Sequence, residues 1–255
     1  MTPLWRFPGI IFLFSFVVLW LATETGVFFR NRSKTLGEAE RNDLSVIVPA
    51  SLTLLGLIIG FSFSMSTGRY DLRKHYEEEE ANAIGTEYVR ADLLPAADAE
   101  KVRTLLKTYL DHRLIFYTVR DADQLKQNDD VTEQLQAKMW AATVAPAVAN
   151  PSALTALATS GMNDVLNSQG YALAAWRNTI PTAAWILMEA IAVFCSMLLG
   201  YNMRRLDPKY LPFVILPVLV SMAFFLIADI DSPRRGVVKV RPQNLESLAQ
   251  SLHVR

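Results

Sequence analysis

The chain has 255 residues, of which 25 are Lys or Arg and 25 are Asp or Glu, so its formal net charge is zero. A neutral balance gives no support for a nucleic-acid-binding protein or for a protein that acts on strongly charged substrates. Half of the residues (51%) are apolar although 20% are charged. Such a composition predicts that the apolar residues are concentrated in a few segments.

Four apolar segments are long enough to cross a bilayer as helices, at residues 8–29, 44–66, 181–203 and 210–228. Each has about 19–23 residues, and a helix of that length spans a hydrocarbon core of roughly 30 Å. The first segment follows Arg6 and resembles a secretory signal in this respect. However, "LATETG" lacks a small-x-small cleavage site and "VFF" extends the apolar run, so an uncleaved membrane helix is predicted.

The four spans divide the chain into a first transmembrane pair (1–68), a helical block (69–179), a second transmembrane pair (180–231) and a basic C-terminal tail (232–255). Four spans place both termini and the block on one side of the membrane. Nine Lys and Arg residues flank the spans on that side and seven flank them on the other. By the positive-inside rule, this side is predicted to be cytoplasmic.

The block between the spans is predicted to be helical throughout. Apolar residues recur at three- to four-residue spacing from Leu72 to Leu94, so the second span is predicted to continue as an amphipathic helix until Pro95 ends it. Asp98 is predicted to cap the next helix. No period-two strand pattern is longer than residues 236–240, and the predicted fold class is an all-α membrane protein.

Later boundaries in the block are predicted from turn residues. Residues 128–130 ("NDD") predict a turn, after which Asp130 and Glu133 have the spacing of a capping box. Residues 150–152 ("NPS") predict the start of the last helix of the block. Gly161 and Gly170 lower the helical propensity of that last helix, so the pattern leaves its continuity open.

Small residues follow one face of the second span. Gly56, Gly60, Ser64 and Gly68 are spaced by four, with threonines beside this row. Small residues at this spacing are typical of closely packed membrane helices. They are also typical of a pore wall, where they leave room for water or an ion. For the pore, the predicted lining residues are Thr53, Gly56, Gly60, Phe63, Ser64 and Thr67.

Two acidic features accompany the spans. Glu189 lies near the middle of the third span, where a carboxylate is costly and is therefore either functional or protonated and bonded to a neighbouring helix. The run Glu77–Glu80 covers one helical turn, so its charges repel and at least one of them needs a partner, for which Arg73 and Lys74 are the nearest candidates. Glu79 falls on the otherwise apolar face and is predicted to be the buried member. In an oligomer the predicted ion-attracting residues are Glu77, Glu79, Glu80 and Glu189.

Other charged residues permit weaker interpretations. His75 and Glu79 are four apart on a helix and could clamp a metal ion, although two ligands are few. The end of the fourth span carries two carboxylates and two arginines, which anchor the span at the membrane boundary or form structural salt bridges to the glutamate-rich helix. These four residues are Asp229, Asp231, Arg234 and Arg235.

Catalytic motifs are not found in the sequence. It contains no Gly-rich phosphate loop, no Gly-x-Ser-x-Gly elbow and no His-Glu-x-x-His helix. Cys195 is the single cysteine and can form no internal disulfide. We therefore predict neither an enzyme nor a bound cofactor.

Several motifs together resemble a known family. They are residues 60–63 ("GFSF"), 69–71 ("RYD"), 79–86 ("EEANAIGT"), 90–95 ("RADLLP") and 229–236 ("DIDSPRRG"). With them the chain resembles the bacterial bestrophin-like domain proteins across nearly its whole length. The resemblance implies kinship with bestrophins, which are pentameric ion channels with four spans, a cytoplasmic helical block and a pore lined by the second span. It also implies a homo-oligomer, a bacterial inner (plasma) membrane location and a preference for anions, whereas the carboxylates favour cations.

The sequence thus supports three hypotheses. The leading one is an oligomeric ion channel or channel-like pore lined by the second span, with undetermined selectivity. The second is a non-conducting membrane scaffold or sensor whose helical block mediates assembly or binds a partner. The third is a metal-handling protein that uses His75 and Glu79.

Overall fold

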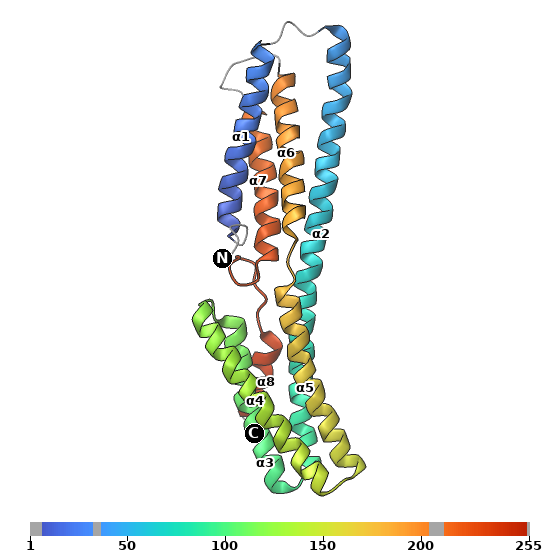
Figure 1. The fold of residues 1–255 in the computed structure, drawn as a ribbon, viewed down its shortest axis with the longest axis vertical. Helices are drawn as coiled ribbons and strands as arrows, with labels where there is room; N and C mark the ends of the chain where they lie inside the picture. Colours follow the sequence, from blue (N-terminus) through green and yellow to red (C-terminus); the bar gives the residue numbers. More distant parts are fainter. Residues whose placement is uncertain (1–6, 33–36, 204–211, 254–255) are drawn as a thin grey trace. The chain divides into compact units, whose positions relative to one another are not determined.

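The computed structural model describes residues 7–32, 37–203 and 212–253. Within these residues the regular structure is helical (Figure 1). In chain order the helices are α1 (Pro8–Arg32), α2 (Glu38–Arg90), the short 3-10 helix η2 (Ala91–Leu93), α3 (Ala96–Thr118), α4 (Ala122–Ala149), α5 (Ala153–Arg177), α6 (Thr182–Asn202), α7 (Pro212–Asp231) and α8 (Gln243–His253).

The chain forms two compact units. The first, called here the membrane unit, comprises Met1–Arg69 and Thr179–Lys239, and the second, the soluble unit, comprises Tyr70–Asn178 and Val240–Arg255. Helix α2 contributes its first part to the membrane unit and its last part to the soluble unit. Four segments of the described chain are long and apolar enough to cross a membrane, and they contain α1, α2, α6 and α7.

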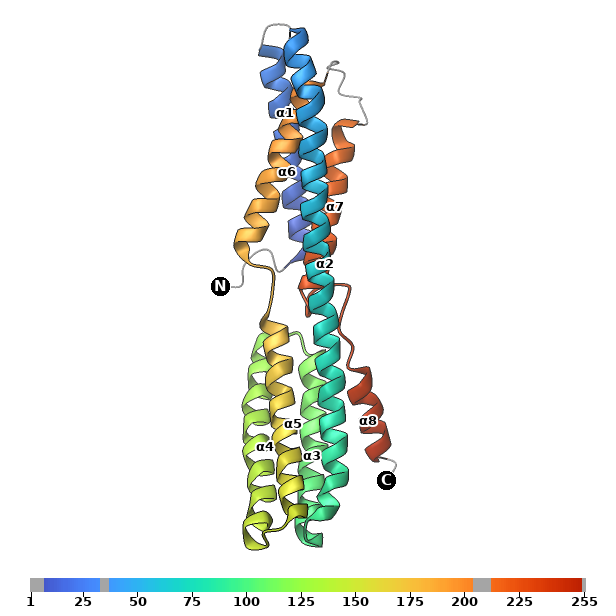
Figure 2. The same ribbon diagram turned by 90° about the vertical axis from the view of Figure 1, so that its right-hand side faces the viewer.

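In the membrane unit, α1 packs against both α6 and α7 (Figure 2). A Cβ atom at Gly200 of α6 would collide with the backbone carbonyl group of Thr23, and one at Gly26 of α1 would collide with that of Met197. Glycine at these two positions therefore lets the two backbones touch, which is how helices gain packing energy in lipid. The core of the unit includes Leu19 and the other buried residues Ile11, Leu55, Met188, Ala192, Cys195, Val220, Phe224 and Ala228.

The predicted spans agree with these helices. Helix α1 begins at the predicted residue 8, and α6 covers nearly all of the predicted third span. Helix α2 begins at Glu38, six residues before the predicted start, because the polar residues ahead of the apolar run continue the helix. The predicted start of the fourth span, Tyr210, lies outside the described residues, and the described helix α7 begins at Pro212.

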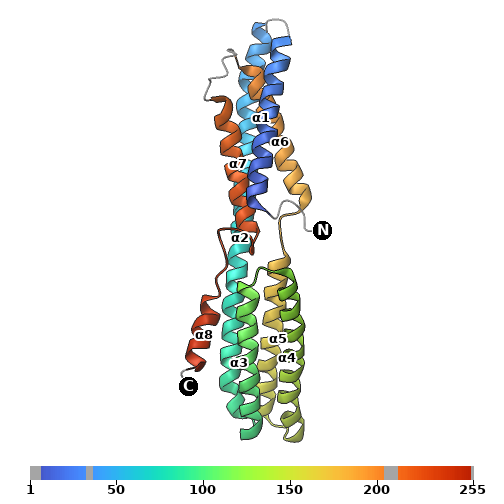
Figure 3. The same cartoon turned by 90° about the vertical axis from the view of Figure 1, so that its left-hand side faces the viewer.

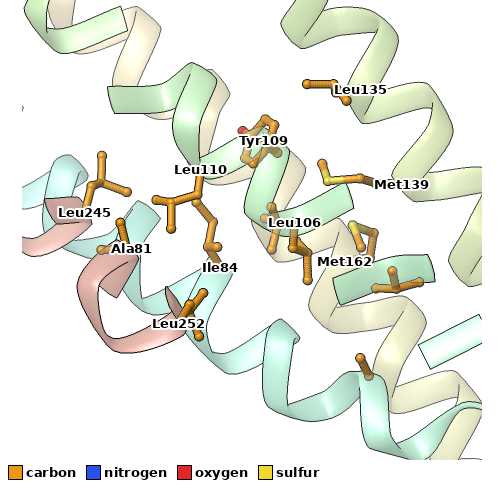
Figure 4. Close-up of a cluster of buried hydrophobic side chains, with 14 of the residues drawn as sticks. Ala81, Ile84, Leu106, Tyr109, Leu110, Leu135, Met139, Met162, Leu245 and Leu252 are labelled. Carbon is orange, nitrogen blue, oxygen red and sulfur yellow. The ribbon is translucent and has the colours of Figure 1, made fainter. Parts of the chain in front are cut away.

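In the soluble unit, α4 packs against both α3 and α5, and α8 packs against α3. Figure 3 shows α3, α4 and α5 running side by side. The core is apolar and includes Leu106 and Tyr109 of α3, Met139 of α4 and Met162 of α5 (Figure 4). Figure 4 also shows Leu245 and Leu252 of α8 beside Ala81 and Ile84 of α2. The amphipathic C-terminal helix thereby completes the core of this unit.

The end of α2 is as predicted. The helix continues to Arg90, η2 adds one more turn, and Pro95 stands at the next boundary, where its ring prevents the preceding backbone from staying helical. The prediction that Asp98 caps the next helix is wrong. Helix α3 starts at Ala96 with Pro95 in the N-cap position, so Asp98 lies in the first turn, where its charge favours the helix dipole.

The predicted turn at residues 128–130 is also wrong. Helix α4 runs through it without a break, and the residue that caps α4 is Asp121, whose side chain accepts hydrogen bonds from the N–H groups of residues 123 and 124. Asn128 is buried, its Oδ1 lies 2.8 Å from Nδ1 of His112, and its Nδ2 donates to the His112 carbonyl oxygen at 3.1 Å. This tertiary pairing satisfies an amide that would otherwise favour a turn.

The predicted start of the last block helix is confirmed. Ser152 and Thr155 form a capping box at the start of α5. The helix is continuous through Gly161 and Gly170, since α5 runs to Arg177. At Gly161 a Cβ atom would collide with Glu87 and Arg90 of α2, so this glycine serves a close helix contact.

Candidate functional site

One face of α2 packs inside the membrane unit. Its buried residues are Val48, Leu55, Ser62 and Ser66, at helical spacing. The hydroxyl group of Ser66 donates to the carbonyl oxygen of Ile227 in α7 at 3.0 Å. These contacts fix the rotation of α2 about its own axis relative to its neighbours in this unit.

The predicted pore-lining residues lie on a different face of α2. Thr53, Gly56, Gly60, Phe63 and Ser64 are exposed, and Thr67 is partly exposed. Within the described residues, a Cβ atom at Gly56, Gly60 or Gly68 would meet nothing within 4 Å apart from its own helix. The hydroxyl groups of Thr53 and Thr67 donate to carbonyl oxygens four residues earlier in α2. We call the six predicted residues the free stripe of α2, because the described residues leave five of them exposed and the sixth, Thr67, partly exposed.

Glu189 lies between α6 and α1. Ser15 of α1 donates a hydrogen bond to its Oε2 at 2.9 Å. The other oxygen, Oε1, is buried and has no hydrogen-bond partner among the described residues. The structure therefore places this carboxyl group against α1 with half of its hydrogen-bonding capacity unused.

The glutamate run is divided between the interior and the surface. Glu77 and Glu80 are fully buried, whereas Glu78 and Glu79 are exposed. The prediction that Glu79 is the buried member is wrong. The spacing of apolar residues predicts that the face of α2 with Leu72 is buried, but Leu72 is exposed. The face that is buried carries mostly charged residues, so apolar spacing does not reveal it.

Glu80 pairs with Arg113 of α3. The guanidinium group donates to both carboxylate oxygens, from Nε and from the terminal nitrogen at 3.2 Å, and the hydroxyl group of Tyr117 donates at 3.2 Å. The same guanidinium lies 4.4 Å over the ring of Phe116. Burial and the nearby charge of Glu80 raise the pKa of Tyr117. The partner of the run is thus Arg113, 33 residues away, rather than a neighbour on α2.

Glu77 and Arg73 bind the ends of two other helices. Oε1 of Glu77 accepts the backbone N–H groups of Asn244 and Leu245 at 2.9 and 3.0 Å, so the carboxylate caps the start of α8. Nε of Arg73 donates to the carbonyl oxygen of Ala175 at 3.1 Å, near the end of α5. A negative group at a helix start and a positive group at a helix end both oppose the unsatisfied backbone dipoles there.

The two candidate metal ligands lie at the surface. His75 and Glu79 are exposed and contribute to the wall of a cavity of about 510 Å³ between α2 and α5. Other residues of this wall include Arg90, Gly161 and Asp164. In the part of the chain that the structure describes, no group of three or more His, Cys, Asp or Glu side chains could hold a metal ion.

The acidic residues at the end of α7 bind groups of the membrane unit. Oδ1 of Asp231 lies 3.3 Å from the guanidinium of Arg69, and its Oδ2 accepts the N–H group of Ile180 at 2.8 Å. Asp229 accepts the N–H groups of residues 237 and 238 at 2.7 and 2.8 Å. These bonds hold the segment before α6 and the turn after α7. Arg69 belongs to α2, so Asp231 forms a salt bridge to the helix that carries the glutamate run, although not to the run itself.

The two arginines of the same motif, Arg234 and Arg235, follow the end of α7 in the sequence. The guanidinium of Arg235 lies 4.1 Å over the ring of Phe7, a distance at which a cation and an aromatic face attract. Arg235 thereby connects the segment after α7 to the residue before α1. The sequence pattern predicted an anchoring role for this motif but offered no signal for Phe7, because Phe7 and Arg235 lie far apart in the sequence.

Comparison with known proteins shows the family to which the chain belongs. A family model described as the bestrophin-like domain matches residues 9–245, so the chain belongs to the bestrophin-like family, as its motifs predicted. No curated protein matches the chain.

Solved structures share the fold. A crystal structure of a bacterial bestrophin homologue from Klebsiella pneumoniae with a tryptophan-to-alanine mutation is similar to this chain at a TM-score of 0.66 and 12% identity, over 95% of this chain and 94% of that one. An aspartate-to-alanine mutant gives 0.64 and 14% identity, over 96% and 97%. A third structure of the homologue, phased with zinc, gives 0.61 and 13% identity, over 95% and 94%. The predicted all-α, bestrophin-like fold with four membrane helices is confirmed.

Proposed function

We propose that the protein is an oligomeric ion channel or channel-like pore of the bacterial inner membrane, in which the free stripe of α2 lines the conducting path. The observation that carries this proposal is that the described residues of the chain leave most of the stripe uncovered. Membership of the bestrophin-like family supports it. In this proposal the soluble unit and both termini lie in the cytoplasm.

The distribution of burial supports the choice of α2. In its most apolar window 11% of the residues are buried, against 33% in α1 and 50% in α7. Gly56 and Gly60 present backbone without a side chain, and Ser64 adds a hydroxyl group. Such a surface leaves space for water and partly hydrated ions when copies of α2 surround an axis, and Phe63 is then the side chain that narrows the path.

The uncompensated negative charge of the acidic run Glu77–Glu80 is smaller than the sequence indicates. Arg113 compensates Glu80, and the start of α8 compensates Glu77. Glu79 is exposed and is therefore the member of the predicted ion-attracting set that best fits a contact with ions outside the membrane. We leave selectivity out of the proposal, and reversal potentials under a salt gradient would determine it.

Ion flux from liposomes that contain the purified protein tests the proposal. We expect flux from the wild type and none from Gly60→Leu, because the leucine side chain fills the space at the stripe. Phe61→Leu is the matched control, since Phe61 is exposed on α2 but points about 100° away from Gly60 around the helix. This control is expected to conduct normally.

The oligomeric state of each variant is measured in parallel, so that a loss of flux is separated from a loss of assembly. Equal flux from Gly60→Leu and the wild type would contradict a pore at the stripe. A stable oligomer without flux would instead select the non-conducting scaffold or sensor.

A further inference from the structure

Glu87 is a buried carboxyl group without a partner. It lies in the soluble part of α2 and is 0% exposed, and neither of its oxygens has a hydrogen-bond partner among the described residues. Glu77 and Glu80 are buried on the same helix, but each of them accepts several hydrogen bonds. A buried group of this kind without partners is rare, because nothing replaces the water it has lost.

Among the described residues, the charged groups that act on Glu87 are those of Arg90 and Asp164. Its Oε2 and a terminal nitrogen of Arg90 both lie against Gly161 of α5, where a Cβ atom would collide with both. The same nitrogen of Arg90 lies 3.9 Å from a carboxylate oxygen of Asp164 on α5, whose side chain is 62% exposed. The guanidinium therefore lies near two carboxyl groups, one at the surface and one in the interior.

The protonation state of Glu87 decides whether the guanidinium of Arg90 is attracted more strongly to Glu87 or to Asp164. Burial raises the pKa of Glu87 to about 8, while Arg90 lowers it and Asp164 raises it further. With its proton bound, Glu87 is neutral and Arg90 can remain with Asp164. Without the proton, a buried negative charge faces a guanidinium one turn away on its own helix, and the two charges attract strongly in a medium of low dielectric constant.

We propose that Glu87, Arg90 and Asp164 form a pH-dependent charge switch at the contact between α2 and α5. As pH rises, Glu87 releases its proton to solvent and the guanidinium of Arg90 moves from Asp164 to Glu87. Because Gly161 has no side chain, Oε2 of Glu87 and the terminal nitrogen of Arg90 both fit against α5 at this point, so the guanidinium is already close to the group it would move to. Because Arg90, Gly161 and Asp164 also line the cavity between α2 and α5, the switch changes the wall of that cavity.

An infrared titration of the full-length protein in detergent micelles tests the first half of the switch. Between about pH 5 and about pH 10, the wild type should show a protonated-carboxyl band that disappears with a midpoint near pH 8, as the raised pKa requires. Glu87→Gln should lack this band. Glu78→Gln, which changes an exposed member of the acidic run, should retain it with an unchanged midpoint.

Variants of the two partners test the second half. Asp164→Asn removes the competing carboxylate, so Arg90 is free for Glu87 and the midpoint should fall by about one pH unit. Arg90→Gln removes the cation, and the midpoint should rise by a similar amount. Asp164 is largely exposed, so its variant should fold normally and gives a result even if Glu87→Gln does not fold.

Two outcomes would overturn the switch. One is the absence of a protonated carboxyl band that depends on Glu87. The other is a midpoint that is the same in Asp164→Asn, Arg90→Gln and the wild type, which would leave Glu87 as an isolated buried acid. Both measurements concern the soluble unit and are independent of whether the spans conduct ions.

Discussion

The buried face of helix α2 has a different composition in the two units. In the membrane unit its buried face consists of aliphatic residues and serines such as Leu55 and Ser66, which pack or donate to a backbone carbonyl group. In the soluble unit the buried face carries Arg73, Glu77 and Glu80. One continuous helix thus has a buried face that changes from small and apolar to charged.

The composition of the buried face follows from the groups that contact it in each unit. In lipid, close approach of backbones supplies most of the packing energy, and small residues favour it. In the soluble unit, helix ends and a neighbouring arginine supply opposite charge, so a buried ion retains strong interactions after it loses water. The buried charges fix which helix ends can meet α2, and removing one partner should be costly.

The largest effect is expected at the Glu80 pair. Glu80→Gln leaves the positive charge of Arg113 buried without a carboxylate, and the free energy of unfolding should fall by about 3–5 kcal/mol. Thermal unfolding of the detergent-solubilised protein measures this change. Glu78→Gln is the matched control and should change stability by less than about 0.5 kcal/mol. A similar stability of both variants would show that the pair contributes little.

The next effect is a dependence of stability on pH. Burial raises the pKa of Glu87 from 4.5 to about 8 in the folded protein. Between these values the unfolded chain has lost the proton and the folded chain still holds it, so the folded state binds more protons and stability falls as pH rises. The slope is at most about 1.4 kcal/mol per pH unit, and it disappears above pH 8.

Denaturant titrations at several pH values measure this slope, and Glu87→Gln should remove its contribution. If the wild type and Glu87→Gln show the same pH dependence between pH 5 and 8, Glu87 does not titrate in this range.

A smaller loss is expected at the contact between α1 and α6. Gly200→Ala places a methyl group against the backbone of Thr23, and relieving that overlap should cost about 1–3 kcal/mol. Gly56→Ala is the control on the free stripe, where a Cβ atom meets nothing within 4 Å, and it should leave stability nearly unchanged. Thermal unfolding in detergent compares the two, and equal losses would contradict a close contact at Gly200.

The smallest effect is expected at the start of α8. Glu77→Ala removes the carboxylate that accepts two backbone N–H groups there, and the loss should be about 0.5–2 kcal/mol, as for other helix caps. Hydrogen exchange should increase mainly in residues 243–253. Glu78→Ala is the control, and equal protection of α8 in both variants would show that Glu77 does not stabilise this helix.

Much of the fold could be predicted because local rules govern it. A run of about 20 apolar residues is helical and spans lipid whatever its neighbours, so three complete spans and the described part of the fourth were placed correctly. Pro95 ends the long helix through its own ring, and Ser152 caps α5 through a hydrogen bond within four residues. The free stripe of α2 could also be identified as a set, since spacing alone places its residues on one face.

The sequence by itself determined the class of the protein, namely a helical membrane protein with a long second helix and bestrophin-like motifs, because these features depend on short-range composition and spacing. Only the tertiary structure decided which face of α2 is buried and which glutamates are compensated. Their partners lie far along the chain, 33 residues away for Arg113 and 167 for Asn244. A charge is buried when such a partner offsets its loss of water, and the spacing of residues on one helix carries no information about that partner.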